Sequence, residues 1–107
     1  MTILVSYAGR PVATVGARRI HLMPNIEALP DGDPVLRFVA AMCAYALEIS
    51  QGSVPGPYSD KAAHAYAIEA LVSEDDLQRV KHLELTHAAA LLAVPVGALE
   101  ARWRPPG

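Results

Sequence analysis

The sequence lacks the residues and segments that mark secreted or nucleic-acid-binding proteins. Its single cysteine, Cys43, cannot form an internal disulfide, and the first ten residues, MTILVSYAGR, show no basic stretch followed by an apolar run of signal-peptide length. We therefore expect a cytoplasmic protein. Lys and Arg number 9 against 11 Asp and Glu, which gives a formal charge of -2. This balance argues against nucleic acid or an anionic membrane as partner, because both recruit proteins through clustered basic residues.

Long hydrophobic runs are also missing. The longest, Phe38 to Leu47, is about half of the roughly 20 residues that a helix needs to cross a bilayer, and it indicates a buried helix instead of a membrane anchor. The 107 residues are 52% hydrophobic, which is enough for one compact core and too little for two ordinary domains. We expect a single domain over residues 1–107.

Common catalytic motifs are absent as well. The sequence has no glycine-rich phosphate loop, no serine with a matching base and no paired cysteines, so no cofactor is predicted. Gly52 and Gly56 belong to a loop that is interrupted by prolines. The neighbours of Cys43 are apolar, which favours a packing role over a nucleophilic one.

What the sequence does contain is a β-rich start. Residues 1–24 predict a short β meander with strands TILVSY, PVATV and RRIHLM, because β-branched residues dominate and Gly and Pro separate the runs. The next stretch, Pro24 to Gly32, has two prolines and no sustained period. We expect an irregular connection there.

Residues 33–104 carry helical signals. Asp33 is placed to cap a helix that begins at Pro34 and continues until Gly52. Apolar residues surround this helix on nearly every side, which predicts a central helix packed from several directions. The sequence thus predicts an α+β fold, a small antiparallel sheet followed by four or so packed helices. The later helices are Asp60 to Val72 after Ser59, one opened by the capping-box spacing of Ser73 and Asp76, and the pair Thr86 to Ala93 and Val96 to Arg104.

Two segments, KAAHAYAIEALVSEDDL and LTHAAALLAVPVGALEARW, carry a family pattern of one helix followed by a helical pair. Upstream, Arg37-Phe38 leads into the central helix. On these residues the chain resembles the ImmA/IrrE family of metallopeptidase-like proteins, loosely over Arg19 to Arg102. The resemblance implies a zincin-like core, and it implies a role beside repressors in mobile elements or stress responses. The positions in register are Ala63, Tyr66, Ala67, Leu71, Leu77, Ala89, Val94, Ala98, Leu99 and Arg102.

The zinc motif of that family is missing. HExxH works because two His at i and i+4 share one helix face and bind zinc, while the Glu takes the proton of the metal-bound water. In the register that the resemblance implies, Met42 and Ala46 replace the two His, Cys43 replaces the Glu, and Asp60 stands at the third ligand. We expect neither zinc nor peptidase activity, and we expect Met42 and Ala46 to pack against the helix of Asp60 to Val72.

Two alternative functions stay open. Asp60 and His64, at i and i+4, are candidates for a residual metal-dependent hydrolase, although two ligands fall short of the three that catalytic zinc needs. An exposed pair on the helix surface is the competing interpretation.

The second alternative is a DNA-binding regulator, because the C-terminal helical pair resembles a helix-turn-helix. A recognition helix offers hydrogen-bond donors near its start, whereas this helix begins with Pro95, Val96 and Gly97. Its basic residues, Arg102 and Arg104, lie at the far end. The pair therefore favours a packing role.

The apolar residues of this pair are spread over more than one face of two short helices, although one face should suffice for a core. Only 19% of the chain is charged. We expect self-association or a protein partner that contacts Leu92, Leu99 and Trp103. The sequence as a whole predicts a non-catalytic regulatory or protein-interaction module on a degenerate metallopeptidase-like scaffold.

Overall fold

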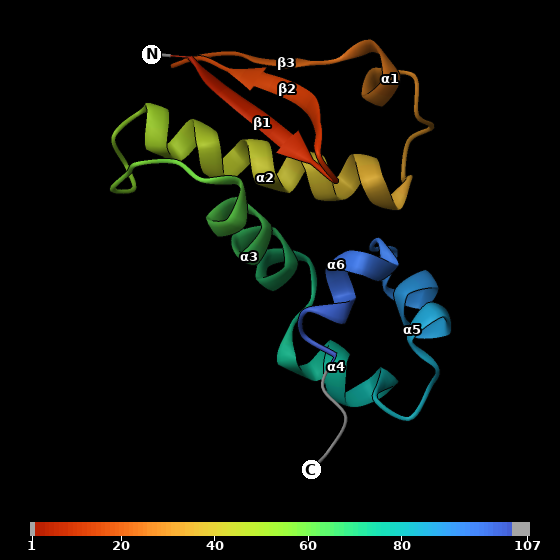
Figure 1. The fold of residues 1–107 in the computed structure, drawn as a ribbon. Helices are drawn as coiled ribbons and strands as arrows, with labels where there is room; N and C mark the ends of the chain where they lie inside the picture. Colours follow the sequence, from red (N-terminus) through yellow and green to blue (C-terminus); the bar gives the residue numbers. More distant parts are fainter. Residues whose placement is uncertain (1, 104–107) are drawn as a thin grey trace.

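The computed structural model describes residues 2–103, which form a small sheet and six helices (Figure 1). The three strands are β1 (Ile3–Tyr7), β2 (Arg10–Val15) and β3 (Ile20–Leu22), antiparallel and in the order β1-β2-β3. Ala8 and Gly9 join β1 to β2 with φ of 54° and 77°, the positive values that a tight hairpin turn requires. The α+β class predicted from the sequence is confirmed.

One face of the sheet packs on a long helix, α2 (Pro34–Ser50), which lies across it in Figure 1. Opposed pairs Ile3–Val15 and Val5–Ala13 turn their side chains into this contact, and all four are buried. The register shifts between Val5 and Ser6, at a β-bulge. Because Ile3 and Val5 face α2 and Leu4 between them faces away, burial alternates along the first part of β1.

The ends of α2 follow their sequence signals. The Asp33 carboxylate accepts hydrogen bonds from the amides of Val35 and Leu36 at 2.8 and 3.4 Å, and Pro34 is the first helical residue. Gly52 follows the C-cap with φ of +81°, a conformation that glycine adopts at low cost. The prediction of a capped central helix is confirmed.

The connection after the sheet differs from its prediction. Pro24 opens a one-turn helix, α1 (Pro24–Glu27), and Ile26 points into the core. Pro24 suits the first helical position because that position needs no amide donor. Four residues are too few to show a helical period, so the prediction of an irregular connection is wrong here.

The remaining helices are α3 (Asp60–Leu71), α4 (Glu74–Val80), α5 (Leu85–Leu92) and α6 (Val96–Glu100). The predicted caps are present: Ser59 accepts from the amide of Ala62, and Ser73 and Asp76 form a reciprocal capping box. α6 ends sooner than the predicted boundary at Arg104, which lies outside the described residues. Five of the six helices correspond to segments predicted as helical from the sequence, and the sixth is the one-turn α1.

Two arginines tie distant helices together. Arg37 of α2 donates from Nη1 to the carbonyls of Leu92 and Ala93, at 3.2 and 2.6 Å, where α5 ends. Arg102, just after α6, binds the carbonyl of Val72 and the carboxylate of Glu74. The buried side chains of the sheet, α2, α3, α5 and α6 belong to one hydrophobic cluster.

Within residues 2–103, no helix has both the length and the apolar character to span a membrane.

Candidate functional site

The two positions at which the family resemblance places zinc-binding imidazoles, Met42 and Ala46, lie one turn apart on α2. Met42 and Ala46 are 1% and 0% exposed, so their predicted burial is confirmed. Cys43, at the position of the expected general base, is also fully buried, and this burial raises the pKa of its thiol to about 11. A thiol with so high a pKa stays protonated at neutral pH.

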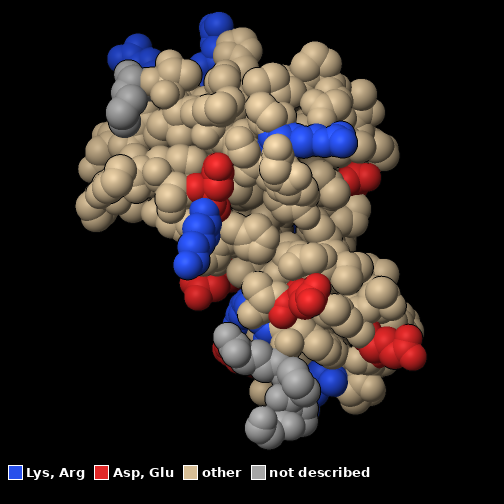
Figure 2. Space-filling model, in the orientation of Figure 1, with Lys and Arg blue, Asp and Glu red and all other residues tan. Residues whose placement is uncertain are grey.

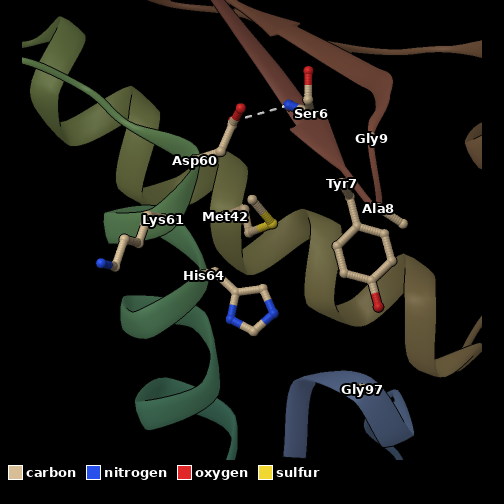
Figure 3. Close-up of a pocket in the computed structure, with 9 residues that line it drawn as sticks. All are labelled: Ser6, Tyr7, Ala8, Gly9, Met42, Asp60, Lys61, His64 and Gly97. Carbon is tan, nitrogen blue, oxygen red and sulfur yellow. Dashed lines mark hydrogen bonds between the residues drawn. The ribbon is translucent and has the colours of Figure 1, made fainter. Parts of the chain in front are cut away.

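Packing is nevertheless incomplete beside Met42. Its side chain reaches the floor of an open pocket of 440 Å³ between the β1–β2 hairpin, α3 and α6 (Figure 3). Figure 3 shows the sulfur of Met42 facing the space between His64 and Tyr7. The pocket is lined by Ser6, Tyr7, Ala8, Gly9, Met42, Asp60, Lys61, His64 and Gly97. Met42 lines this pocket and Ala46 does not, so the side chains expected to fill the cleft leave it open beside Met42.

Asp60, the expected third ligand, is engaged in the structure of the pocket wall. Its Oδ1 accepts the backbone amide of Ser6 at 3.0 Å and the hydroxyl of Tyr58 at 2.7 Å. Burial raises the pKa of Tyr58, and the hydrogen bond to the carboxylate raises it further, so the phenol remains a donor. Asp60 therefore connects β1, the loop before α3 and α3 itself.

His64 lies one turn further along α3 and packs on aromatic rings. Its imidazole meets Phe38 edge to face at a centroid distance of 4.7 Å, and it lies nearly parallel to Tyr7 at 6.4 Å. Burial lowers the pKa of His64 and raises that of Tyr7, so both groups are neutral at pH 7. The His64 ring is half-buried, not the exposed partner of Asp60 that the i, i+4 spacing predicted.

Other metal ligands do not join this pair. Within residues 2–103, no group of three or more His, Cys, Asp or Glu side chains is placed to hold a metal ion. The other polar side chains of the pocket lining are Ser6, Tyr7 and Lys61, and Figure 3 shows the ammonium of Lys61 pointing away from Met42. The pocket is a mixed polar and apolar surface with neutral aromatic walls.

The three residues of the C-terminal helical pair that were predicted to contact a partner differ in their exposure. Leu99 is 0% exposed and belongs to the hydrophobic core, so it is not available to contact a partner. Leu92 and Trp103 are half-buried and pack against the core cluster. The exposed apolar side chains of the pair are instead Leu91, at 62%, and Val96, at 39%.

The same pair offers little to a DNA groove. Helix α6 has five residues and is therefore about 7 Å long. The basic residue that follows it, Arg102, binds Val72 and Glu74, and its side chain is only 19% exposed. Figure 2 shows the charged side chains of the visible face scattered among uncharged ones, with both signs interspersed. Arg104 lies outside the described residues.

A cluster of three tyrosines, Tyr45, Tyr58 and Tyr66, is present that the sequence did not predict. The ring of Tyr45 on α2 packs at a tilt against that of Tyr66 on α3, at a centroid distance of 5.1 Å, and against that of Tyr58 in the intervening loop, at 6.2 Å. The tyrosines show no regular spacing, so only the placement of Tyr45 and Tyr66 on adjacent core helices hinted at the contact. The roles of Arg37 and Arg102 left no local signal either.

Comparison of the chain with family models, curated proteins and solved structures found no match. The ImmA/IrrE resemblance therefore stays a prediction from the sequence.

Proposed function

We propose that the protein is a non-catalytic regulatory module that acts through protein contacts, on a degenerate scaffold of the ImmA/IrrE type. The observation that carries the proposal is the burial of Met42 and Ala46 on α2. These are the i and i+4 positions at which a zinc peptidase of this type presents two imidazoles. A zincin-like core is part of the same proposal.

The chemistry of the substituted residues supports it. A thioether is a soft, weak ligand, and Ala46 has no donor atom at all. The raised pKa of Cys43 makes its thiol a poor replacement for a carboxylate base at neutral pH. Asp60, the single carboxylate left at the site, already accepts two hydrogen bonds through one oxygen.

A role through contacts is supported by the exposed apolar side chains on the C-terminal helices. Leu91 and Val96 remain accessible, although the neighbouring Leu99 shows that the pair has a core face of its own. Apolar side chains that gather on one surface mark interaction sites, and Leu91 lies with Leu83 and Leu92 at one groove. The partner is a second copy of the chain or another protein.

The decisive experiment restores the motif. The triple variant Met42→His, Cys43→Glu, Ala46→His places the HExxH groups beside Asp60, and zinc is then measured after dialysis, together with hydrolysis of an unfolded protein substrate. The wild-type protein should retain far less than one zinc and show no hydrolysis, whereas the triple variant should retain about one zinc per chain.

A matched control puts the same spacing on the solvent-facing side of α2. Ala40 and Ala44 are exposed, so the double variant Ala40→His, Ala44→His carries two imidazoles at i and i+4 away from Asp60. It should lose its zinc on dialysis. Stoichiometric zinc in the wild-type protein that disappears in Asp60→Ala would overturn the proposal, and a folded triple variant without zinc would contradict the scaffold register.

A further inference from the structure

The α4–α5 face, defined by Asp75, Arg79, His82 and Leu91, carries a groove lined by leucine and basic side chains. The groove has a volume of 450 Å³ and lies between the C-terminal end of α4 and α5. Leu91 stands at its rim and is 62% exposed, more than any other large apolar side chain among residues 2–103. Half-buried Leu83 and Leu92 line the interior. An exposed leucine thus lies beside a recess that offers leucine side chains for apolar contact and is bordered by Arg79, His82 and His87.

Charge is ordered along the same face. Asp75, Arg79 and His82 are spaced at i, i+4 and i+7, so they form one stripe along α4 and the turn that follows it. The stripe is acidic at the N-terminal end of α4 and basic at the C-terminal end. All three side chains are exposed, and Arg79 is 75% exposed although it pairs with Asp76.

This order of charge selects the occupant. A partner of one charge sign would meet like charge at one end of the stripe. A second copy rotated by 180° would place each Asp75 opposite the basic end of the other copy, and a twofold axis repeats that contact twice. Leu91 of each copy would enter the groove of the other.

We propose that two copies of the chain associate about a twofold axis across the α4–α5 face, with α4 antiparallel to its counterpart. The inference rests on the proposed role in protein contacts, because it names the partner and the surface. It stands apart from the loss of catalysis, since a chain without zinc chemistry can be a monomer.

The size of the face sets the expected strength. Helices of seven and eight residues are about 10 and 12 Å long, so the contact falls well below the roughly 800 Å² per partner of a standard interface. The dimer should therefore be weak and concentration-dependent. We expect mostly monomer at about 10 μM and a substantial dimer population at about 1 mM.

Analytical ultracentrifugation over that concentration range tests the apolar contact. Leu91→Lys should weaken association at least tenfold, because it replaces a buried apolar contact with an ammonium group facing Arg79, His82 and His87 of the other copy's groove. Leu4→Lys is the matched control, since Leu4 is also exposed, at 52%, but lies on β1 in the sheet. A wild-type protein that is monomeric at about 1 mM, or equal weakening by the two variants, would overturn the proposal.

A charge exchange tests the orientation. Asp75→Lys and His82→Glu should each weaken association, because each places like charges opposite one another across the axis. The double variant should recover most of the loss, and this exchange leaves the Arg79–Asp76 pair intact. A double variant no better than the worse single variant rules out the antiparallel arrangement. Circular dichroism confirms the fold of each variant, and zinc and hydrolysis assays on the same samples judge the proposed function separately.

Discussion

Replacing the half-buried Arg37 should destabilise the protein more than replacing an arginine whose side chain is exposed. Its Nη1 donates to the carbonyls of Leu92 and Ala93, where α5 ends and Ala93 turns left-handed with φ of 56°. The last carbonyls of a helix lack partners within the helix, so an external donor is needed there. Arg37 supplies that donor from the first turns of α2.

The magnitude follows from the type of contact. Hydrogen bonds to charged groups contribute about 1.5–3 kcal/mol each, but one nitrogen serves both carbonyls and the site is only partly buried. We therefore expect Arg37→Met, which keeps an apolar stem, to lower the free energy of unfolding by about 2 kcal/mol. For a domain of this size the melting temperature should fall by roughly 8–12 °C.

Urea denaturation followed by circular dichroism measures the effect. Arg10→Met, in the exposed β1–β2 hairpin, is the control and should change the free energy of unfolding by less than about 0.5 kcal/mol. Arg37→Lys should recover only part of the loss, because an ammonium lacks the planar fork of the guanidinium. A loss for Arg37→Met no larger than that of the control would refute the capping role.

Two further outcomes are expected at the pocket. Asp60→Ala should lower the free energy of unfolding in urea by about 1 kcal/mol, because it removes the acceptor for the Ser6 amide and the Tyr58 hydroxyl. Asp60→Asn keeps an acceptor oxygen and should lower it less, so equal losses for the two variants would contradict this role. With a pKa of about 11, only about one Cys43 thiol in a thousand is ionised at pH 8, so a disulfide reagent should label the native protein at least about 100-fold more slowly than the urea-unfolded chain. Equal labelling rates would contradict the burial of Cys43.

Local signals accounted for most of the helix boundaries. Asp33 with Pro34, Ser59, and the Ser73–Asp76 box each act within four residues, so the sequence alone contains the interaction. The one-turn α1 was missed because four residues cannot show a period. The predicted C-terminal helix is longer than α6, which ends at Glu100. Beyond it, Arg102 binds the carbonyl of Val72 at the end of α3, and a contact across 30 positions has no local signal in the sequence.

The position of the candidate site could be predicted from the sequence, but the hydrogen bonds of its residues could not. The resemblance placed Met42, Ala46 and Asp60 near one another, and the structure brings Met42 and Asp60 to one pocket. That Asp60 binds a strand 54 residues away carries no signal in composition or spacing. The exposure of Leu91 in place of Leu99 depends on how α5 and α6 pack, which periodicity over eight and five residues cannot fix.

The hydrogen bond from Ser6 to Asp60 also bears on aggregation. β1 is an edge strand, and the outward amides of an edge strand invite a strand from another molecule. Here the carboxylate of α3 occupies the amide of Ser6, and the adjacent bulge interrupts the flat run of the strand. The Asp60 side chain thus protects the β1 edge of the sheet from intermolecular strand pairing at Ser6.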